Sequence, residues 1–389
     1  MRILCYAQNL IGVGHFVRML AIARGLGAAA HQVHLVDGGR AVPRRQGPFD
    51  PSLVTLPRLV RLGGRLAVEE DGNSVVEVLT DRTRRLAEAT ARIRPDAVLV
   101  DHYPFGRWEL DEEIGGTISA ARRANAGVRV VCSVRDNLRS HYRRGEQDAY
   151  ELGVLVRLRR FFDEILIHAD PGFARLEEAF TRAGEIPVPQ RYTGFVVDPS
   201  TVSPDVTLPS GPYAVLSCGG STTNLGFLLA AVEAFRGLRA RRALGAMPLL
   251  VFPGPVDEAG AAALRTALGD EPFQLFGFSP DFPAWLAGSA LSISRAGYNT
   301  CAQILASGVR SILVPNPDNA DQTPRAWRLA ELGLAAVVEG DPPGAAALAA
   351  AITTALACPP PRHALDLNGV AATLAVLERP RGADGAAVA

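Results

Sequence analysis

The run ALSISRAGYNTCAQILASGVRSILVP, residues 290–315, decides the fold expected for this chain. A strand-like run (290–295) passes through a glycine into a helical pattern, and a second strand-like run (310–315) follows it. Short strands that alternate with helices in this way build parallel sheets covered by helices. The same rhythm continues along most of the 389 residues, so we expect an α/β protein.

Two series of strands are predicted, which suggests two domains. The first series lies at 2–7, 32–37, 96–101, 128–133 and 164–169, and the second at 213–218, 248–253, 273–278, 290–295 and 310–315. Helical patterns also cover 343–357 and 363–378, whereas 38–73 has little periodicity and is expected to be an irregular insertion. We expect a first domain over 1–198, a linker over 199–212, a second domain over 213–378 and a frayed tail over 379–389. Two such domains create a cleft where the carboxyl ends of their sheets meet.

Composition excludes several classes of function. The 40 basic and 40 acidic residues balance, so the chain lacks the basic excess typical of a nucleic-acid partner. All 40 basic residues are arginine, which excludes Schiff-base lysine chemistry and a lysine-containing phosphate loop. Five scattered cysteines without a CxxC pair, and the lack of a membrane-length apolar run, indicate a cytoplasmic protein. Peripheral contact with the inner face of a membrane stays open.

Three loops that follow strands of the second series carry ligand-binding chemistry. In CGGSTTN (218–224) the backbone of Gly219 and Gly220 can approach a ligand and Ser221 can bind phosphate, although an ordinary strand-to-helix connection is the alternative. In SRAGYNTCAQIL (294–305) a diphosphate would meet the helix amino end, unless this is a capped helix that binds nothing. Its expected ligand contacts are Arg295, Gly297, Tyr298, Asn299 and Thr300, with Gln303 on the ribose.

The third loop, PNPDNADQTPRAW (315–327), offers donors and acceptors suited to sugar hydroxyls. These are Asn319, Asp321 and Gln322, with helix capping as the alternative role of Asp321.

With these motifs, residues 279–334 resemble the donor half of GT-B glycosyltransferases, particularly family 28 and its MurG-like members. The segments IGVGHFVR, SVRDNL, FFDEILIHADPGF and RYTGF extend the likeness to the acceptor domain of a group of predicted glycosyltransferases. The resemblance implies two Rossmann-like domains facing across a cleft. It also implies a diphosphate at Gly297, Tyr298 and Asn299, and a nucleotide base near Phe278 and Ser279. At the ribose position the family has Glu, whereas this chain has Gln303.

The glycine loop GVGH brings the first helix to the same cleft. Gly12 and Gly14 permit close backbone approach, and His15 sits at the helix amino end, where the dipole disfavours protonation by about 0.3–1 kcal/mol. A neutral imidazole suits a general base, although a structural histidine is the alternative. Asp101 follows a predicted strand and either orients His15 or caps a helix.

Three further polar residues, His102, Arg135 and Asp136, follow strands of the first series and should reach the cleft edge. For Arg135 and Asp136, an internal ion pair is the alternative. His31 and His34 would point to opposite faces of a strand, so no metal site is assigned. The arginine-containing run 52–66 suits an acceptor lid, a membrane-surface contact or a solvated loop.

These observations predict a metal-independent glycosyltransferase with His15 as the base and no cofactor, and the resemblance implies that it moves a hexosyl group with inversion. Its donor would be a nucleoside diphosphate sugar, with UDP as the first expectation and dTDP or GDP as alternatives. Its acceptor would be a small molecule or a lipid-linked molecule, and no nucleic acid is expected. A nucleotide-sugar hydrolase of the same fold, whose GxGH loop is also followed by an arginine, is the nearest rival. A non-catalytic nucleotide-sugar binding protein is the other.

Overall fold

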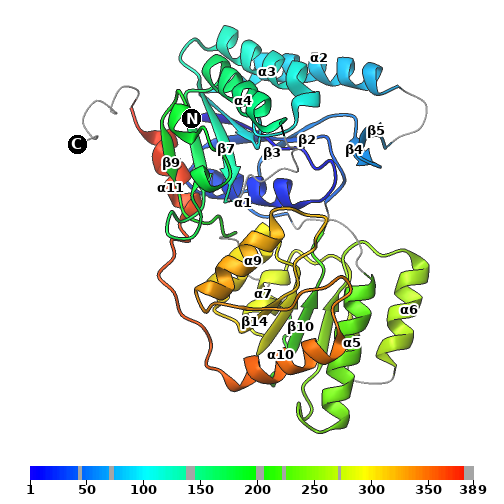
Figure 1. Ribbon diagram of the computed structural model, residues 1–389. Helices are drawn as coiled ribbons and strands as arrows, with labels where there is room; N and C mark the ends of the chain where they lie inside the picture. Colours follow the sequence, from blue (N-terminus) through cyan, green and yellow to red (C-terminus); the bar gives the residue numbers. More distant parts are fainter. Residues whose placement is uncertain are drawn as a thin grey trace.

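The computed structural model describes residues 1–42, 46–69, 74–136, 145–198, 206–220, 225–269 and 273–380. They form two halves, each a sheet covered by helices on both faces (Figure 1). The first sheet has seven parallel strands in the order β3-β2-β1-β6-β7-β8-β9. The strands are β1 (Arg2–Tyr6), β2 (Gln32–Asp37), β3 (Ser52–Thr55), β6 (Ala97–Asp101), β7 (Arg129–Arg135), β8 (Glu164–His168) and β9 (Gln190–Tyr192).

The central strands of this sheet are apolar on both faces because helices bury both. One face packs against α2 (Val75–Ile93), α3 (Asp111–Ala124) and α4 (Gln147–Phe161). The other packs against α1 (Gly14–Ala28) and α11 (Gly369–Glu378). Three short 3-10 turns lie in the connections, at η1 (Trp108–Leu110), η2 (Leu176–Glu178) and η3 (Ala183–Glu185).

The second sheet has six parallel strands in the order β12-β11-β10-β13-β14-β15. They are β10 (Ala214–Ser217), β11 (Leu249–Phe252), β12 (Phe273–Leu275), β13 (Leu291–Ser294), β14 (Ser311–Leu313) and β15 (Ala336–Val337). One face is covered by α5 (Leu225–Ala240), α6 (Glu258–Leu268) and α10 (Ala345–Ala357). The other is covered by α7 (Phe282–Ala287), α8 (Tyr298–Ser307) and α9 (Gln322–Glu331).

Both sheets reverse their strand order at one place, which positions the site. In the first sheet β1 lies between β2 and β6, and in the second β10 lies between β11 and β13. At such a switch point the loops after two adjacent strands diverge and leave a crevice at the carboxyl edge. The loop before α1 and the loop before α8 each start from a strand beside a switch point, and the two helices contact each other.

Residues 38–73 are more regular than the sequence indicates. They contain β3 at the edge of the first sheet and an antiparallel hairpin of β4 (Leu59–Leu62) and β5 (Arg65–Val68). Gly63 and Gly64 turn the hairpin with φ of 54° and 81°. The strands β4 and β5 have four residues each and contain arginine. Their alternation of apolar and polar residues is therefore too short to be recognised in the sequence.

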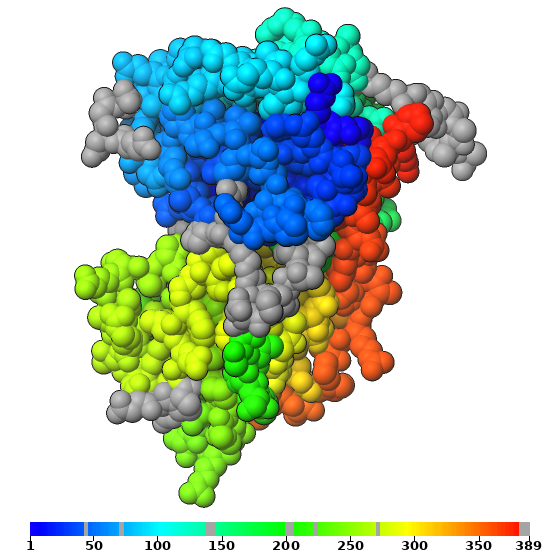
Figure 2. All heavy atoms as spheres, turned by 180° about the vertical axis from the view of Figure 1, so that it is seen from behind, coloured from blue at the N-terminus to red at the C-terminus, as the bar shows by residue number. Residues whose placement is uncertain are grey.

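The end of the chain also departs from expectation. Residues 363–368 are not helical, and α11 begins at Gly369. This helix returns to the first half, where Val376 and Leu377 are buried with residues of α1. In Figure 2 the orange and red C-terminal segment runs along one side of both halves. The sequence places this helix in the second domain. In the structure it packs on the first half, because its apolar face covers the first sheet.

Buried polar contacts join the two halves. The Tyr298 hydroxyl donates to the His168 carbonyl at 2.8 Å and accepts from the Val196 amide at 3.0 Å. The Arg325 guanidinium donates to both carboxylate oxygens of Asp136, at 2.5 and 2.7 Å. No helix among the described residues is long and apolar enough to span a membrane.

Candidate active site

A cavity of about 350 Å³ lies between the two halves, lined by the loops of both switch points. Its volume falls within the range of small-molecule sites. Most residues expected at the site from the sequence line it: Gly12, Gly14, His15, Arg135, Gly219, Gly220, Phe278, Ser279, Arg295, Gly297, Tyr298, Asn299, Thr300, Gln303, Asn319, Asp321 and Gln322. Ser221 lies outside the described residues. Asp101, His102 and Asp136 are not among the lining residues.

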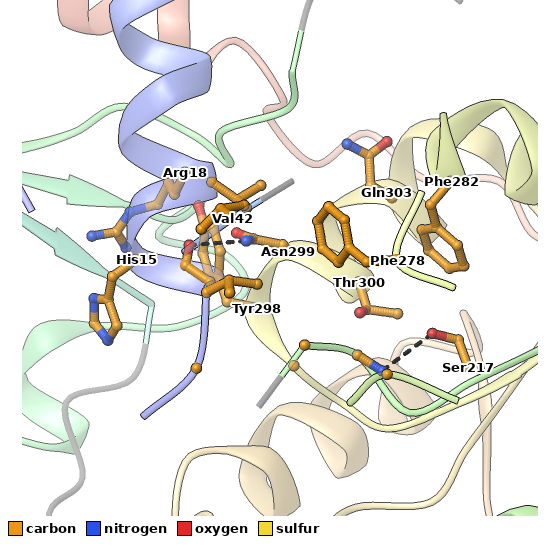
Figure 3. Close-up of a pocket in the computed structure, with 18 of the residues that line it drawn as sticks. His15, Arg18, Val42, Ser217, Phe278, Phe282, Tyr298, Asn299, Thr300 and Gln303 are labelled. Carbon is orange, nitrogen blue, oxygen red and sulfur yellow. Dashed lines mark hydrogen bonds between the residues drawn. The ribbon is translucent and has the colours of Figure 1, made fainter. Parts of the chain in front are cut away.

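His15 projects from the first turn of α1 beside the cavity (Figure 3), and 13% of its side chain is exposed. Its Nδ1 lies 2.7 Å from Oδ2 of Asp101, which is buried at the end of β6. Because the ionised carboxylate only accepts, Nδ1 carries the proton and Nε2 keeps a free lone pair. Arg18, one turn along α1, donates to Oδ1 of Asp101. Asp101 was expected either to orient His15 or to cap a helix, and its contacts with His15 and Arg18 are those of a residue that orients His15.

The electrostatics keep the imidazole neutral at pH 7. Burial lowers the pKa of His15 to about 4, against the opposing effect of Asp101. The guanidiniums of Arg135 and Arg107 lower it further because they repel the imidazolium. Burial alone would raise the pKa of Asp101, but His15 and Arg18 outweigh it and hold that pKa well below its usual range.

His102 and Asp136 differ from the positions expected for them. The His102 ring centroid lies 5.3 Å from that of His15, and His102 is not among the residues that line the cavity. Asp136 is buried against Arg325 of α9, so its carboxylate bridges the two halves. Asp136 thus forms an internal ion pair, although with Arg325 and not with Arg135, whereas Arg135 at the end of β7 lines the cavity.

The glycine turn after β10 lets the two halves approach. Gly219 has φ of +75°, a conformation that side chains disfavour. A Cβ on Gly220 would overlap Cγ2 of Val13, so the turn and the loop before α1 touch. The positive φ therefore explains the glycine at 219, and the close contact with Val13 explains the glycine at 220.

Two helix amino ends open into the cavity from opposite halves. At α1 the N-cap residue is Val13 and at α8 it is Gly297, and neither makes a side-chain capping bond. Neither helix has an acidic residue in its first turn. Asn299 Nδ2 donates to the Gly14 carbonyl at 2.9 Å and thus links the two ends (Figure 3). At α1 the Phe16 amide donates to Asn9 Oδ1 at 3.0 Å, whereas at α8 the N-cap residue makes no such bond. The positive ends of the two helix dipoles at one cavity make this a place for a polyanion.

Arg295 and Gln322 border the cavity but are engaged elsewhere. The Arg295 guanidinium is 2.8 Å from Asp341, donates to the Val314 and Pro315 carbonyls, and is almost fully buried. Its charge is therefore already balanced, contrary to the free cation expected. Gln322 Oε1 accepts from the amides of Ala296 and Asn316, so it fixes the two loops around it.

Asp321 does not cap its helix with its side chain. Its Oδ2 is 2.9 Å from Arg325 and 3.5 Å from Arg135. Burial would raise its pKa, but Arg135 and Arg325 hold the pKa of this carboxyl well below its usual range. An ionised carboxylate at the cavity wall is a strong acceptor for sugar hydroxyls.

An aromatic wall closes the side of the cavity next to the second sheet. Phe278, 41% exposed, lies on this side with Phe282, and Gln303 and Thr300 stand nearby on α8 (Figure 3). Phe252 also lines the cavity, with its ring centroid 5.1 Å from that of Phe282. Flat apolar groups beside hydrogen-bonding side chains suit a nucleoside.

Sequence reasoning assigned no site role to three arginines of this region, although it noted the arginine that follows the GxGH loop, Arg18. Arg325 stands four residues after Asp321, a spacing at which helical side chains meet, so the pair could have been found. Arg18 stands one turn after His15. Arg107, which lines the cavity from the loop after β6, follows no motif and carries no signal in the sequence.

No group of three or more metal-ligating side chains occurs in the described part of the chain. His31, in the HQVH run, instead contacts Glu378 at 3.1 Å, and β2 begins only at Gln32.

Residues 219–360 match the model of the glycosyltransferase family 28 C-terminal domain. A relative from Azoarcus sp. (strain BH72), a UDP-N-acetylglucosamine--N-acetylmuramyl-(pentapeptide) pyrophosphoryl-undecaprenol N-acetylglucosamine transferase, is 36% identical over 179 residues, or 44% of this chain and 42% of the relative. The chain spans less than half the length of the curated relatives it matches. The resemblance to family 28 is thereby confirmed for the second half of the chain.

Solved structures extend the likeness to the whole fold. The glycotransferase of kitacinnamycin is 17% identical with a TM-score of 0.61, covering 96% of this chain and 93% of that one. Acinetobacter baumannii MurG is 18% identical with a TM-score of 0.52, covering 90% and 89%. The expected GT-B fold, with two Rossmann-like domains, is confirmed.

Proposed function

We propose that this chain is a glycosyltransferase that moves a hexosyl group from a nucleoside diphosphate sugar to an acceptor hydroxyl. One observation carries the proposal. A neutral imidazole, oriented by Asp101, stands beside a cavity into which the uncapped amino end of α8 also opens. Such an arrangement joins a base for the nucleophile with a site for the leaving diphosphate.

In the proposed reaction the acceptor oxygen attacks the anomeric carbon while the bond from that carbon to the diphosphate oxygen breaks. The hydroxyl proton passes to Nε2 of His15, and the resulting imidazolium is stabilised by Asp101. A single displacement of this kind inverts the anomeric centre. General-base assistance contributes roughly 10²–10⁴ in rate.

The donor would lie across the second half. Its diphosphate would meet the amides of Tyr298, Asn299 and Thr300, its ribose would meet Gln303, and its base would pack near Phe278. Asn319 and Asp321 would hold the sugar. UDP is our first choice of nucleotide because the matched relatives are named as UDP-N-acetylglucosamine-dependent enzymes. Helix dipoles and arginines can balance the leaving charge, so we propose that no metal is required.

The acceptor is proposed to be a small or lipid-linked molecule, as the name of the relatives suggests. The β4–β5 hairpin then becomes a candidate for contact with the membrane surface, because Leu62 is 59% exposed beside Arg61 and Arg65. Flotation with vesicles of anionic lipid at low salt tests this. If the protein does not float with the vesicles, the contact is ruled out.

The test of the function begins with thermal shift against UDP, dTDP and GDP, since a ligand of the folded state raises the melting temperature. The matching nucleotide sugar is then incubated with the protein alone. Slow release of free sugar supports a transferase, whereas rapid stoichiometric release at saturating donor identifies water as the acceptor and a hydrolase. If none of the nucleotides changes the melting temperature, the proposed donor site is wrong.

A further inference from the structure

The carboxylate of Asp101 is held by two side chains of α1. His15 Nδ1 lies 2.7 Å from Oδ2, and Arg18, three residues later, donates through Nη2 to Oδ1. Residues three apart lie on the same side of a helix, and Figure 3 shows both side chains projecting from α1 in the same direction. Each oxygen of Asp101 therefore has its own partner, one an imidazole and the other a cation.

A buried carboxylate beside an imidazole has two opposing effects on a general base. It orients the ring, but it also attracts a proton to it, and Asp101 raises the pKa of His15 for this reason. Burial outweighs this effect and brings the pKa to about 4, while Arg135 and Arg107 also lower it and the neighbouring His102 is kept neutral by burial. A counter-charge on the other carboxylate oxygen weakens the attraction of a proton and keeps the orientation.

Arg18 supplies this counter-charge. It is the only arginine within ion-pair distance of Asp101 among the described residues, although Arg107 is attracted by the same carboxylate from farther away. The side chains of Arg18 and Asp101 are each 1% exposed. In the described part of the chain, Nε and Nη1 of Arg18 are buried without a hydrogen-bond partner. Hydrogen bonds alone therefore do not account for the burial of this cation.

An aromatic ring from the other half covers the Arg18 guanidinium. Its Cζ lies 5.4 Å from the centroid of the Tyr298 ring, within the range of a cation–π contact. The hydroxyl bonds described above fix this ring, which also stacks on Phe195 with centroids 5.7 Å apart. Arg325 lies over the same ring at 5.9 Å, but it has two carboxylates of its own. Tyr298 is the first residue of α8, so the helix that opens into the cavity also supports Arg18.

We propose that Arg18, supported by the Tyr298 ring, is a positioning residue of the reaction: it fixes and neutralises Asp101, so that this carboxylate orients His15 without attracting a proton to it. The inference rests on the proposed function, because it concerns the base of that reaction. The arrangement is complete only when α8 packs against α1. The base and the proposed diphosphate site therefore form together.

The test observes His15 directly and needs neither donor nor acceptor. The full chain is labelled with carbon-13 histidine, and the Cε1–H signal that is missing from His15→Gln is followed against pH. In the unchanged protein this signal should not titrate between pH 8 and pH 5, in line with a pKa of about 4. In Arg18→Met its midpoint should rise by at least about one pH unit, because Asp101 has lost its counter-charge.

Two substitutions at Tyr298 test the support from the other half. Tyr298→Leu removes the ring and should raise the His15 midpoint, as Arg18→Met does. Tyr298→Phe keeps the ring under the guanidinium and should raise the midpoint by less than half as much. Combining Tyr298→Leu with Arg18→Met should add nothing, since both act through Arg18. If Arg18→Met does not fold, the comparison of Leu with Phe at position 298 carries the test.

Arg24→Gln is the matched control, because it removes an arginine of α1 whose partners are Asp50 and Asp198, and the His15 midpoint should stay low. An unchanged midpoint in Arg18→Met, or an equal rise in Arg24→Gln, overturns the inference. An unchanged midpoint in Tyr298→Leu overturns the part that involves the second half.

Calorimetry with the nucleoside diphosphate that gives the largest thermal shift completes the test. Its affinity should be kept in Arg18→Met, and a loss of at least tenfold would assign Arg18 to the donor diphosphate and overturn the inference. Failure of the proposed function would appear separately, as the absence of a thermal shift with every nucleotide. The two failures are therefore distinguishable.

Discussion

Replacing Asp136 by Asn should weaken the contact between the two halves by a calculable amount. The Asp136 and Arg325 side chains are 1% and 0% exposed, and two hydrogen bonds join them. A bond to a charged group contributes about 1.5–3 kcal/mol. Asn keeps one accepting oxygen, so one bond is lost and Arg325 also loses its main counter-charge.

Breaking a buried ion pair costs about 3–5 kcal/mol. Arg325 keeps Asp321 at 2.9 Å and donates to the Ala296 carbonyl at 2.7 Å, which places the expected loss near the lower end, about 3 kcal/mol. Urea unfolding at pH 7, followed by far-ultraviolet circular dichroism, measures it.

The control is Asp148→Asn, because Asp148 pairs with Arg182 while 68% of its own side chain is exposed. Such surface pairs contribute about 0–1 kcal/mol. A loss for Asp136→Asn no larger than that of the control would refute the reasoning. The Asp136→Asn and Arg325→Met double variant should lose less than the sum of the single losses, since both remove one interaction.

Three further outcomes are expected. His15→Ala should lower kcat by roughly 10²–10⁴ while calorimetry shows unchanged nucleotide affinity; an equal loss of affinity would make His15 a binding residue. Because the pKa of His15 is about 4, initial rates should hold from pH 8 down toward pH 5, and a decline centred near pH 6.5 would contradict a buried neutral base. Gly220→Ala should cost about 1–3 kcal/mol in urea unfolding because its Cβ meets Val13, and Val13→Ala in the same chain should restore most of the loss; no recovery would show that the clash with Val13 is not the cause.

Much of the framework could be predicted because buried parallel strands are short apolar runs with helices between them. The central strands β1, β6, β10 and β13 were found within a residue or two, and with them the loops that carry His15 and Gly297. The hairpin of β4 and β5 was missed because its alternation is brief and carries arginines.

Side-chain pairing was harder to predict because it depends on residues distant in sequence. Arg295 has the charge and the position expected of a phosphate ligand, but Asp341, 46 residues later, neutralises its charge. Asp136 follows a strand as catalytic residues do, yet it meets Arg325, 189 residues away. Arg107 could be recognised only after the fold had placed it beside His15 and Arg135. Local patterns specify elements, whereas charge balance is a property of the packed interior.

The return of α11 to the first half has a consequence for how the protein is made. Its residues Val376 and Leu377 complete a core that otherwise consists of residues from the first two hundred positions. During synthesis the amino-terminal half therefore emerges from the ribosome with one face of its sheet partly uncovered. That face stays partly uncovered until α11 has been translated. The amino-terminal half therefore completes its folding only after the second half has been synthesised and can begin to fold.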